Sequence, residues 1–265
     1  MINFYSQGGE DVILNELFEG QGDGFFVEVG CIDGRRFSNT LTFEERGWKG
    51  LLVEAHSGYM DLLRENRPNS IVCHCAAGEK DEDDVIFFAN SRGSLSTLDK
   101  SRESQFKRRY KQFFTGFEEQ RVSKARLDTL FKKHNVKEID ILSLDIEGYE
   151  VEAMRGLDLG IYRPRVLLIE SDSPRHERSL DNLIIPFGYS KSVKIGGNIF
   201  YLIDASMKRK IENRKFEPVL IHTQHPMDKC GDTRLKIRID TAKYRRREIR
   251  QRIKRRILSL VNFSR

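Results

Sequence analysis

A short segment rich in glycine and acidic residues follows the first strongly apolar run of the chain. It reads Glu28-Val29-Gly30-Cys31-Ile32-Asp33-Gly34. Gly30 and Gly34 permit a sharp turn and a close approach of a ligand to the backbone, while Glu28 and Asp33 place carboxylates beside that turn. The spacing is G-x-x-x-G, not the G-x-G-x-x-G that cradles a pyrophosphate, and the chain contains no G-x-x-x-x-G-K-[ST] phosphate loop. The segment therefore favours a ligand with a positive centre and no phosphate.

Glu54 is a further candidate for ligand binding. It follows the apolar run Leu51-Leu52-Val53 and lies 24 positions after Gly30. In Rossmann-like folds, a carboxylate about 20 residues beyond the glycine turn binds the ribose hydroxyls of a nucleotide. S-adenosylmethionine fits both features, because it contains a ribose and carries positive charge on its sulfonium and ammonium groups. An ordinary strand-to-helix turn is the structural alternative.

Two later apolar runs also end in carboxylates. Ile141–Leu144 is followed by Asp145, and Val166–Ile169 is followed by Glu170. Transfer of a group to a protic acceptor needs aligned reactants and removal of the acceptor's proton, so we expect Asp145 to orient or deprotonate the acceptor, with Glu170 as a second catalytic candidate. His176, farther along, is the best histidine candidate for a general base. A solvent-exposed loop histidine is the structural alternative.

A divalent cation is another means of acidifying a hydroxyl. Asp145, Glu147, Glu170 and Asp172 supply the oxygen ligands that hard cations prefer, and they are the expected ligands if a metal is bound. Their spacing matches no diagnostic metal-binding motif. The sequence therefore leaves a metal open and slightly favours catalysis without one.

Apolar runs of strand length alternate with helical patterns between residues 10 and 204. Continuous apolar strands separated by helices predict an α/β fold with a mostly parallel sheet and helices on both of its faces. Ligands of such sheets bind at the carboxyl ends of the strands, so the acidic residues are expected to share one edge. The predicted strands are Phe25–Val29, Leu51–Val53, Ile71–Cys73, Ile141–Leu144 and Val166–Ile169.

Many short blocks of the chain, in the same order, resemble the FkbM-type methyltransferases. The resemblance covers residues 5–203. It implies a Rossmann-like class I fold, S-adenosylmethionine as the methyl donor, and a hydroxyl of a sugar, glycan or related natural product as the acceptor. The matching blocks include Glu28-Val29-Gly30, Phe37-Ser38-Asn39-Thr40, Leu52-Val53-Glu54, Asn66-Arg67-Pro68, Ala76-Ala77, Leu127-Asp128-Thr129-Leu130 and Leu144-Asp145-Ile146-Glu147-Gly148-Tyr149-Glu150.

The resemblance also implies roles for individual residues. Ser38 and Asn39 would begin a helix and hold the methionine carboxylate through free N–H groups, and Glu54 would bind the ribose diol. Ala76-Ala77 would flank the adenine, and Gln7 would fold back over the pocket unless it is an ordinary surface glutamine. The complete implied donor set is Gln7, Glu28, Gly30, Asp33, Gly34, Ser38, Asn39, Glu54, Ala76 and Ala77.

Length and composition are those of a globular enzyme. The chain has 265 residues, of which 38% are hydrophobic, so it can bury a sizeable core. Its apolar runs are too short to span a bilayer, and its N-terminus lacks the basic and apolar regions of a signal peptide. We therefore expect a cytoplasmic protein.

Charge divides the chain into two parts. Residues 1–204, the expected methyltransferase domain, carry 27 basic and 34 acidic residues, whereas residues 205–265 carry 19 basic and 6 acidic residues. The second part is therefore a basic C-terminal extension. Within the domain, residues 91–125 form a polar stretch that is too long for an ordinary connection. We expect either a lid over the site or a helical insertion there.

Residues 241–262 have the pattern of a basic amphipathic helix. Such a helix can lie in a membrane interface with its cations on anionic headgroups, which would make the protein peripheral on the inner face of a membrane. Docking of the apolar stripe on the acidic domain or on a second subunit is the alternative, and the oligomeric state is left open. The stripe consists of Ile249, Ile253, Ile257, Leu260 and Val261.

Two other functions are compatible with parts of the sequence. The basic extension suggests a nucleic-acid methyltransferase, but Tyr244 and Phe263 are its only aromatic residues after position 240, few for base stacking. The Asp145-Ile146-Glu147-Gly148 segment also replaces the N-P-P-Y-type motif of base-amino methyltransferases. A non-catalytic S-adenosylmethionine-binding module is the other alternative, which the intact acidic and glycine positions disfavour.

Overall fold

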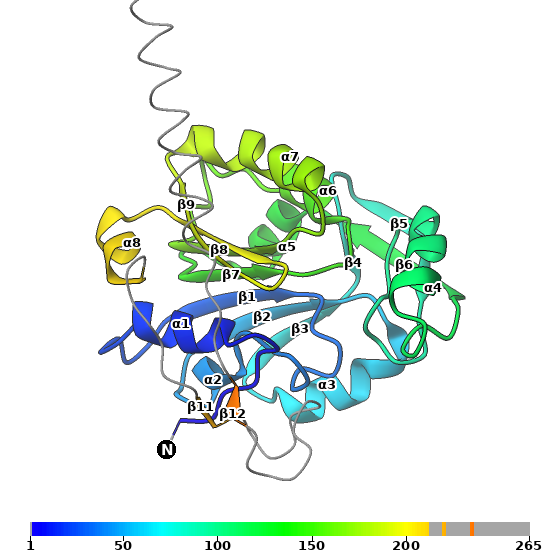
Figure 1. Ribbon diagram of the computed structural model, residues 1–265, viewed down its shortest axis with the longest axis horizontal. Helices are drawn as coiled ribbons and strands as arrows, with labels where there is room; N and C mark the ends of the chain where they lie inside the picture. Colours follow the sequence, from blue (N-terminus) through cyan, green and yellow to red (C-terminus); the bar gives the residue numbers. More distant parts are fainter. Residues whose placement is uncertain (1, 212–218, 221–233, 236–265) are drawn as a thin grey trace, which may run out of the picture.

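The computed structural model describes residues 2–211, 219–220 and 234–235. Its centre is a seven-stranded sheet in the order β3-β2-β1-β7-β8-β10-β9 (Figure 1). β10 pairs antiparallel with both neighbours and the other pairings are parallel, so the predicted α/β fold with a mostly parallel sheet is confirmed. The strands are β1 (Phe25–Val29), β2 (Lys49–Glu54), β3 (Ser70–His74), β7 (Ile141–Leu144), β8 (Val166–Glu170), β9 (Ser190–Ile195) and β10 (Asn198–Leu202).

Helices cover both faces of this sheet (Figure 1). In β1, Val27 and Val29 join the core under one set of helices, while Phe26 joins the core under the other set. This two-sided burial explains why the central strands are continuously apolar rather than alternating. One face packs on α1 (Glu10–Leu17), α2 (Leu41–Glu44) and α3 (Met60–Asn66), and the other on α5 (Leu127–Lys133), α6 (Glu150–Arg155) and α7 (Pro174–Ile184).

A second, three-stranded sheet lies beside the main one. It has the order β4-β6-β5, formed by β4 (Ala76–Ala77), β5 (Glu82–Ala89) and β6 (Glu118–Ala125). β6 belongs to the stretch 91–125, so the expectation of a lid or a helical insertion is wrong for its last eight residues. The earlier part contains α4 (Glu103–Arg109) and closes around a buried Phe106.

The predicted boundary after residue 204 cuts through the packed core. Helix α8 (Ala205–Ile211) buries Met207 and Ile211 in the same core as α1 and α2. Two further short strands, β11 (Val219–Leu220) and β12 (Arg234–Leu235), pair antiparallel. The predicted amphipathic helix 241–262 lies outside the described residues. None of the helices in the described ranges is long and apolar enough to cross a bilayer.

Arg67, at the C-terminal end of α3, joins this helix to the turn after β1. Its side chain is fully buried, and its guanidinium donates to Glu44 Oε2 at 2.7 Å and to Glu28 Oε2 at 3.2 Å. It also donates to the Gly34 carbonyl oxygen at 3.1 Å and to Thr40 Oγ1 at 2.9 Å. A single cation thus neutralises two buried carboxylates and fixes the turn between β1 and α2.

Replacement of Arg67 by alanine should destabilise the whole domain. The substitution leaves Glu28 and Glu44 buried without their cation, which costs about 3–5 kcal/mol of the free energy of unfolding. Urea denaturation followed by circular dichroism measures this loss. Arg64→Ala is the matched control, because Arg64 pairs with Asp61 on the exposed surface of the same helix, and it should leave the midpoint unchanged. Equal midpoints for the two variants would contradict the role of Arg67.

Candidate active site

A cavity of about 480 Å³ lies at the carboxyl ends of the parallel strands. This volume is within the range of small-molecule sites. The structure brings the predicted turn at Gly30, the carboxylate of Glu54, and the acidic residues Asp145 and Glu170 to its wall. The predicted residues that line it are Gln7, Glu28, Gly30, Ser38, Asn39, Glu54, Ala76, Ala77, Asp145, Glu147 and Glu170.

Gly30 allows the segments after β1 and β7 to approach each other. It has φ +86°, and a Cβ atom at this position would lie 1.8 Å from the carbonyl oxygen of Asp145. Only glycine fits such an approach. Strain is concentrated at this cavity, because four of the five non-glycine residues with positive φ in the described ranges line it. These four are Ile32, Phe37, Leu95 and Glu147.

The carboxylate of Glu28 is occupied by the protein itself. It accepts from Ser38 Oγ at 2.9 Å, from the Asn39 N–H at 2.8 Å and from Thr40 Oγ1 at 2.5 Å, in addition to Arg67. Glu28 therefore holds the turn after β1 in place, and its oxygens have little remaining capacity to accept from a ligand.

The same contacts correct the expectation for Ser38 and Asn39. Helix α2 begins at Leu41 and has only four residues, so neither residue starts it. The Ser38 N–H donates to the Arg35 carbonyl oxygen and the Asn39 N–H donates to Glu28, so neither is free for a methionine carboxylate. Both residues line the cavity, where the Asn39 side chain donates to Ser143 Oγ at 3.0 Å.

Asp33 and Gly34 are not among the cavity-lining residues. Asp33 Oδ1 accepts from the N–H groups of Arg35 and Arg36 at 3.0 and 2.7 Å. Gly34 has φ +76°, and a Cβ atom there would lie 2.5 Å from Arg67 Cγ. Both residues thus shape the turn from behind, which does not fit the expected contact with the methyl donor.

Glu54, the last residue of β2, presents a rigid carboxylate at the cavity. Its two oxygens accept from the N–H groups of Ile32 and His56, each at 2.7 Å. Burial raises the pKa of Glu54, and the backbone donors partly oppose this effect. The side chain is held in one position before any ligand binds, as the predicted role in ribose recognition requires.

Four carboxylates lie together at the ends of β7 and β8, of which Glu150 is buried and Asp145, Glu147 and Glu170 are partly buried. Burial is the main cause that raises the pKa of Asp145, Glu147, Glu150 and Glu170, and the negative charges of the neighbouring carboxylates raise the first three further. The pKa of Glu150 rises to about 8. Asp145 and Glu170 also share a hydrogen bond. Such carboxylates bind protons or cations far more readily than exposed ones.

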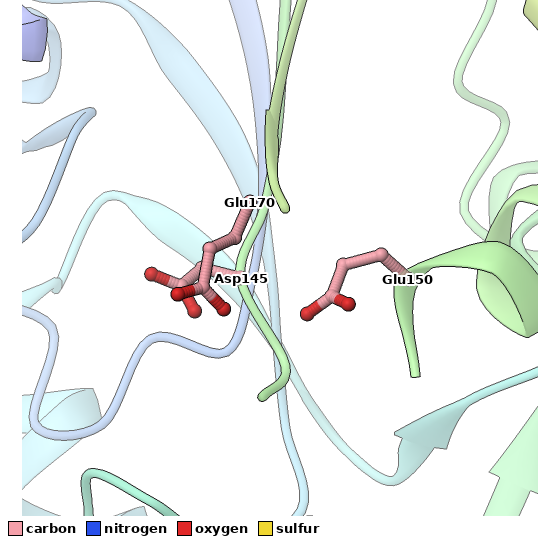
Figure 2. Close-up of side chains that lie close together, drawn as sticks. All are labelled: Asp145, Glu150 and Glu170. Atoms are coloured by element: carbon pink, nitrogen blue, oxygen red, sulfur yellow. The ribbon is translucent and has the colours of Figure 1, made fainter. Parts of the chain in front are cut away.

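The predicted metal ligands are only partly brought together. Among the described residues, the three whose oxygen atoms all lie within 4.8 Å of one another are Asp145, Glu150 and Glu170 (Figure 2). Glu147 lines the cavity but is not in this group, and Asp172 pairs with Arg102 instead. Burial alone would raise the pKa of Asp172, but the Arg102 guanidinium outweighs it and lowers the pKa.

His176 does not occupy the position expected of a general base. It is the third residue of α7 rather than part of a loop, and it is not among the cavity-lining residues. Its Nε2 lies 3.3 Å from Glu150 Oε2. Burial lowers the pKa of His176. Through this contact it can position the Glu150 carboxylate.

Several residues of the cavity were not predicted from the sequence. Glu10 and Asn198 meet there through a hydrogen bond of 2.9 Å, although 188 positions separate them. Glu150, which does not line the cavity, was signalled only by its place at the end of the Asp145–Glu150 block. The segment before β6 contributes Tyr110 and Phe113, which no spacing rule connects with Glu54 or Asp145. The other unpredicted lining residues include Arg36, Phe37, Phe87, Gly93, Ser94, Leu95, Ser96, Leu98, Ser143 and Tyr149.

Comparisons with solved structures find distant likenesses to methyltransferases. Precorrin-6y C5,15-methyltransferase from Geobacter metallireducens GS-15 is 10% identical, with a TM-score of 0.42 over 72% of this chain and 85% of that chain. An O-methyltransferase from Bacillus cereus in complex with SAH is 15% identical, with a TM-score of 0.43 over 77% and 84%. No curated protein matches the chain significantly. At these identities and TM-scores the likenesses carry no argument about function.

The family comparison is more specific. A family model described as the methyltransferase FkbM domain matches residues 23–190, which is more than half of the chain. The matched segment runs from β1 through β8 and α7, so it includes Gly30, Glu54 and the acidic residues at the ends of β7 and β8. The chain therefore belongs to the FkbM methyltransferase family, with the predicted class I fold and S-adenosylmethionine as its methyl donor.

Proposed function

We propose that this protein transfers the methyl group of S-adenosylmethionine to a hydroxyl group of a sugar or glycan. The observation that carries the proposal is the carboxylate pair of Asp145 and Glu170 at the wall of the cavity that Gly30 and Glu54 also line. A hydroxyl nucleophile must lose its proton during transfer, and an amine or a thiolate needs this help less. Partly buried carboxylates with raised pKa values, placed beside the donor pocket, suit a hydroxyl acceptor best.

The residues around the cavity fit the methyl donor. Glu54 is fixed by two N–H donors and can accept from the ribose diol, and the small Ala76 and Ala77 leave room for a flat adenine. Gly30 lets the backbone of the turn come close to the ligand. S-adenosylmethionine supplies a methyl group on a positively charged sulfur. The excess of carboxylates at the ends of β7 and β8 is complementary to that charge.

Asp145 is the residue best placed to act on the acceptor. In the transfer, a bond forms between the acceptor oxygen and the methyl carbon, the bond from this carbon to sulfur breaks, and the hydroxyl proton leaves. Because burial and neighbouring charges raise the pKa of Asp145, its ionised form accepts a proton more readily than an exposed aspartate does. Glu170 hydrogen-bonds to Asp145 and can share the proton, so it supports the same step.

The acceptor side of the cavity is consistent with a sugar. Tyr110 and Phe113 line it from the segment before β6, and Phe113 is 54% exposed, so its ring is available for the apolar C–H face of a pyranose. Asn198 Oδ1 is buried and accepts no hydrogen bond within the described residues, so it is available to a hydroxyl donor. Aromatic faces combined with hydroxyl acceptors are the chemistry that carbohydrate recognition needs.

The alternative functions and the cellular location of the protein stay predictions. The nucleic-acid hypothesis and the membrane hypothesis both depend on the basic extension, most of which lies outside the described residues. The cytoplasmic location likewise stays a prediction, and the oligomeric state stays open. A transfer assay with labelled donor over sugar nucleotides, oligosaccharides, lipid-linked glycans and RNA tests the proposed function, and methylation of RNA alone would overturn it.

Glu54→Gln should weaken the binding of S-adenosylmethionine. The amide replaces a charged acceptor by a neutral one, and hydrogen bonds to charged groups contribute about 1.5–3 kcal/mol. Titration calorimetry measures the donor affinity directly. Asp33→Asn is the matched control, since Asp33 belongs to the neighbouring turn but does not line the cavity, and its affinity should equal that of the unmodified protein. If Asp33→Asn weakened S-adenosylmethionine binding more than Glu54→Gln does, Asp33 rather than Glu54 would be the residue that binds the donor.

Asp145→Asn should separate catalysis from donor binding. The amide keeps the size of the side chain but cannot take up the acceptor proton, so kcat should fall by about 10²–10⁴-fold, the usual contribution of a general base. Calorimetry should find the donor still bound, and circular dichroism should find the fold unchanged. Full turnover in this variant would remove Asp145 from the acceptor step.

A further inference from the structure

Three carboxylates from three separate segments converge beside the cavity. Asp145 follows β7, Glu170 ends β8 and Glu150 begins α6. One oxygen of each lies within 4.8 Å of the others. Figure 2 shows the Glu150 carboxylate directed towards those of Asp145 and Glu170. We define these three residues as the carboxylate triad.

Glu150 is held by the backbone through one oxygen, while its other oxygen accepts no hydrogen bond within the described residues. Its side chain is fully buried, and Oε1 accepts from the N–H groups of Ile146 and Gly148 at 2.9 and 3.0 Å. Oε2 is buried and accepts no hydrogen bond within the described residues, and His176 Nε2 lies 3.3 Å from it. A buried carboxylate oxygen normally has a partner, so this atom indicates that a ligand belongs beside it.

The charges of the triad are only partly offset by protein cations. Glu147 adds a further, partly buried carboxylate beside the three of the triad. Arg102 forms its ion pair with Asp172, a carboxylate outside the triad, and from there its charge lowers the pKa of Glu147 and Glu170 without reversing the rise that burial causes. Buried charges of one sign are stable only when they are paired or coordinate a metal.

We propose that Asp145, Glu150 and Glu170 bind a divalent cation of the Mg²⁺ or Mn²⁺ class. All three ligands are carboxylate oxygens, which hard cations prefer, and such ions keep some coordination positions for water or substrate. Asp145 and Glu170 line the cavity, so these positions would face it. If the proposed function holds, the ion also lowers the pKa of the acceptor hydroxyl. The binding of the cation itself does not depend on that function.

The test is a Mn²⁺ titration of the full-length protein after treatment with a chelator, without donor or acceptor. Electron paramagnetic resonance counts free and bound Mn²⁺, and the midpoint of thermal unfolding gives a second readout. We expect one saturable site per chain that Mg²⁺ displaces and that raises the midpoint. Glu150→Gln should weaken Mn²⁺ binding at least about tenfold, the smallest effect that even indirect partners of a metal site usually show.

Glu147→Gln is the matched control. It removes an equal charge from the same buried region, but Glu147 is outside the triad, so Mn²⁺ should still bind at one site. The fold of Glu150→Gln is checked by circular dichroism, and its amide oxygen can still accept from Ile146 and Gly148. If this variant does not fold, Glu170→Gln takes its place.

Two outcomes would overturn the proposal. The first is no saturable Mn²⁺ binding by the unmodified protein. The second is equal weakening by Glu147→Gln and Glu150→Gln, because this would indicate diffuse attraction to negative charge rather than coordination. Since neither measurement uses methyl transfer, failure of the cation site and failure of the proposed function are distinguished. If the unmodified protein binds Mn²⁺ but transfers no methyl group to a sugar or glycan, only the proposed function is contradicted.

Discussion

The fully buried guanidinium of Arg67 holds the donor side of the cavity in shape. It neutralises Glu28 and Glu44 and thereby ties the turn after β1 to helices α2 and α3. With Glu28 fixed, the hydroxyl and N–H groups of residues 38–40 converge on it, and the turn at Gly30 passes within close reach of Asp145. An arginine suits this position because its planar group donates in several directions at once.

Two acidic clusters among the described residues differ in what balances them. Around Arg67 the carboxylates are paired, so their charge contributes to the shape of the turn and is not available to a ligand. At the ends of β7 and β8, by contrast, Asp145, Glu150 and Glu170 face one another, while the neighbouring Arg102 is paired with Asp172. A fold tolerates such an imbalance at sites where a ligand completes the charge balance. This contrast separates supporting carboxylates from those that are available for chemistry.

Segments outside the main sheet complete the cavity. The chain between β5 and β6 packs around Phe106 and is joined to the loop after β8 by the pair of Arg102 and Asp172. From this anchored segment Tyr110 and Phe113 reach the cavity. The part of the site expected to choose the acceptor is therefore built on the segment with the least regular structure, while the donor side is built on the ends of strands. This division lets the acceptor change without disturbing the sheet.

The sequence alone determined the strands and the edge of the sheet at which the site lies. Short continuous apolar runs that alternate with helical patterns favour strands buried on both faces. A carboxylate or glycine directly after such a strand lies at the carboxyl edge of the sheet, so Gly30, Glu54, Asp145 and Glu170 could be assigned to that edge from the sequence. Which of these groups remain available was decided by tertiary structure. Arg67 occupies Glu28, Arg102 occupies Asp172, and α6 directs Glu150 towards Asp145. Such pairings join residues far apart in the chain, and the local periodicity of a sequence carries no information about them.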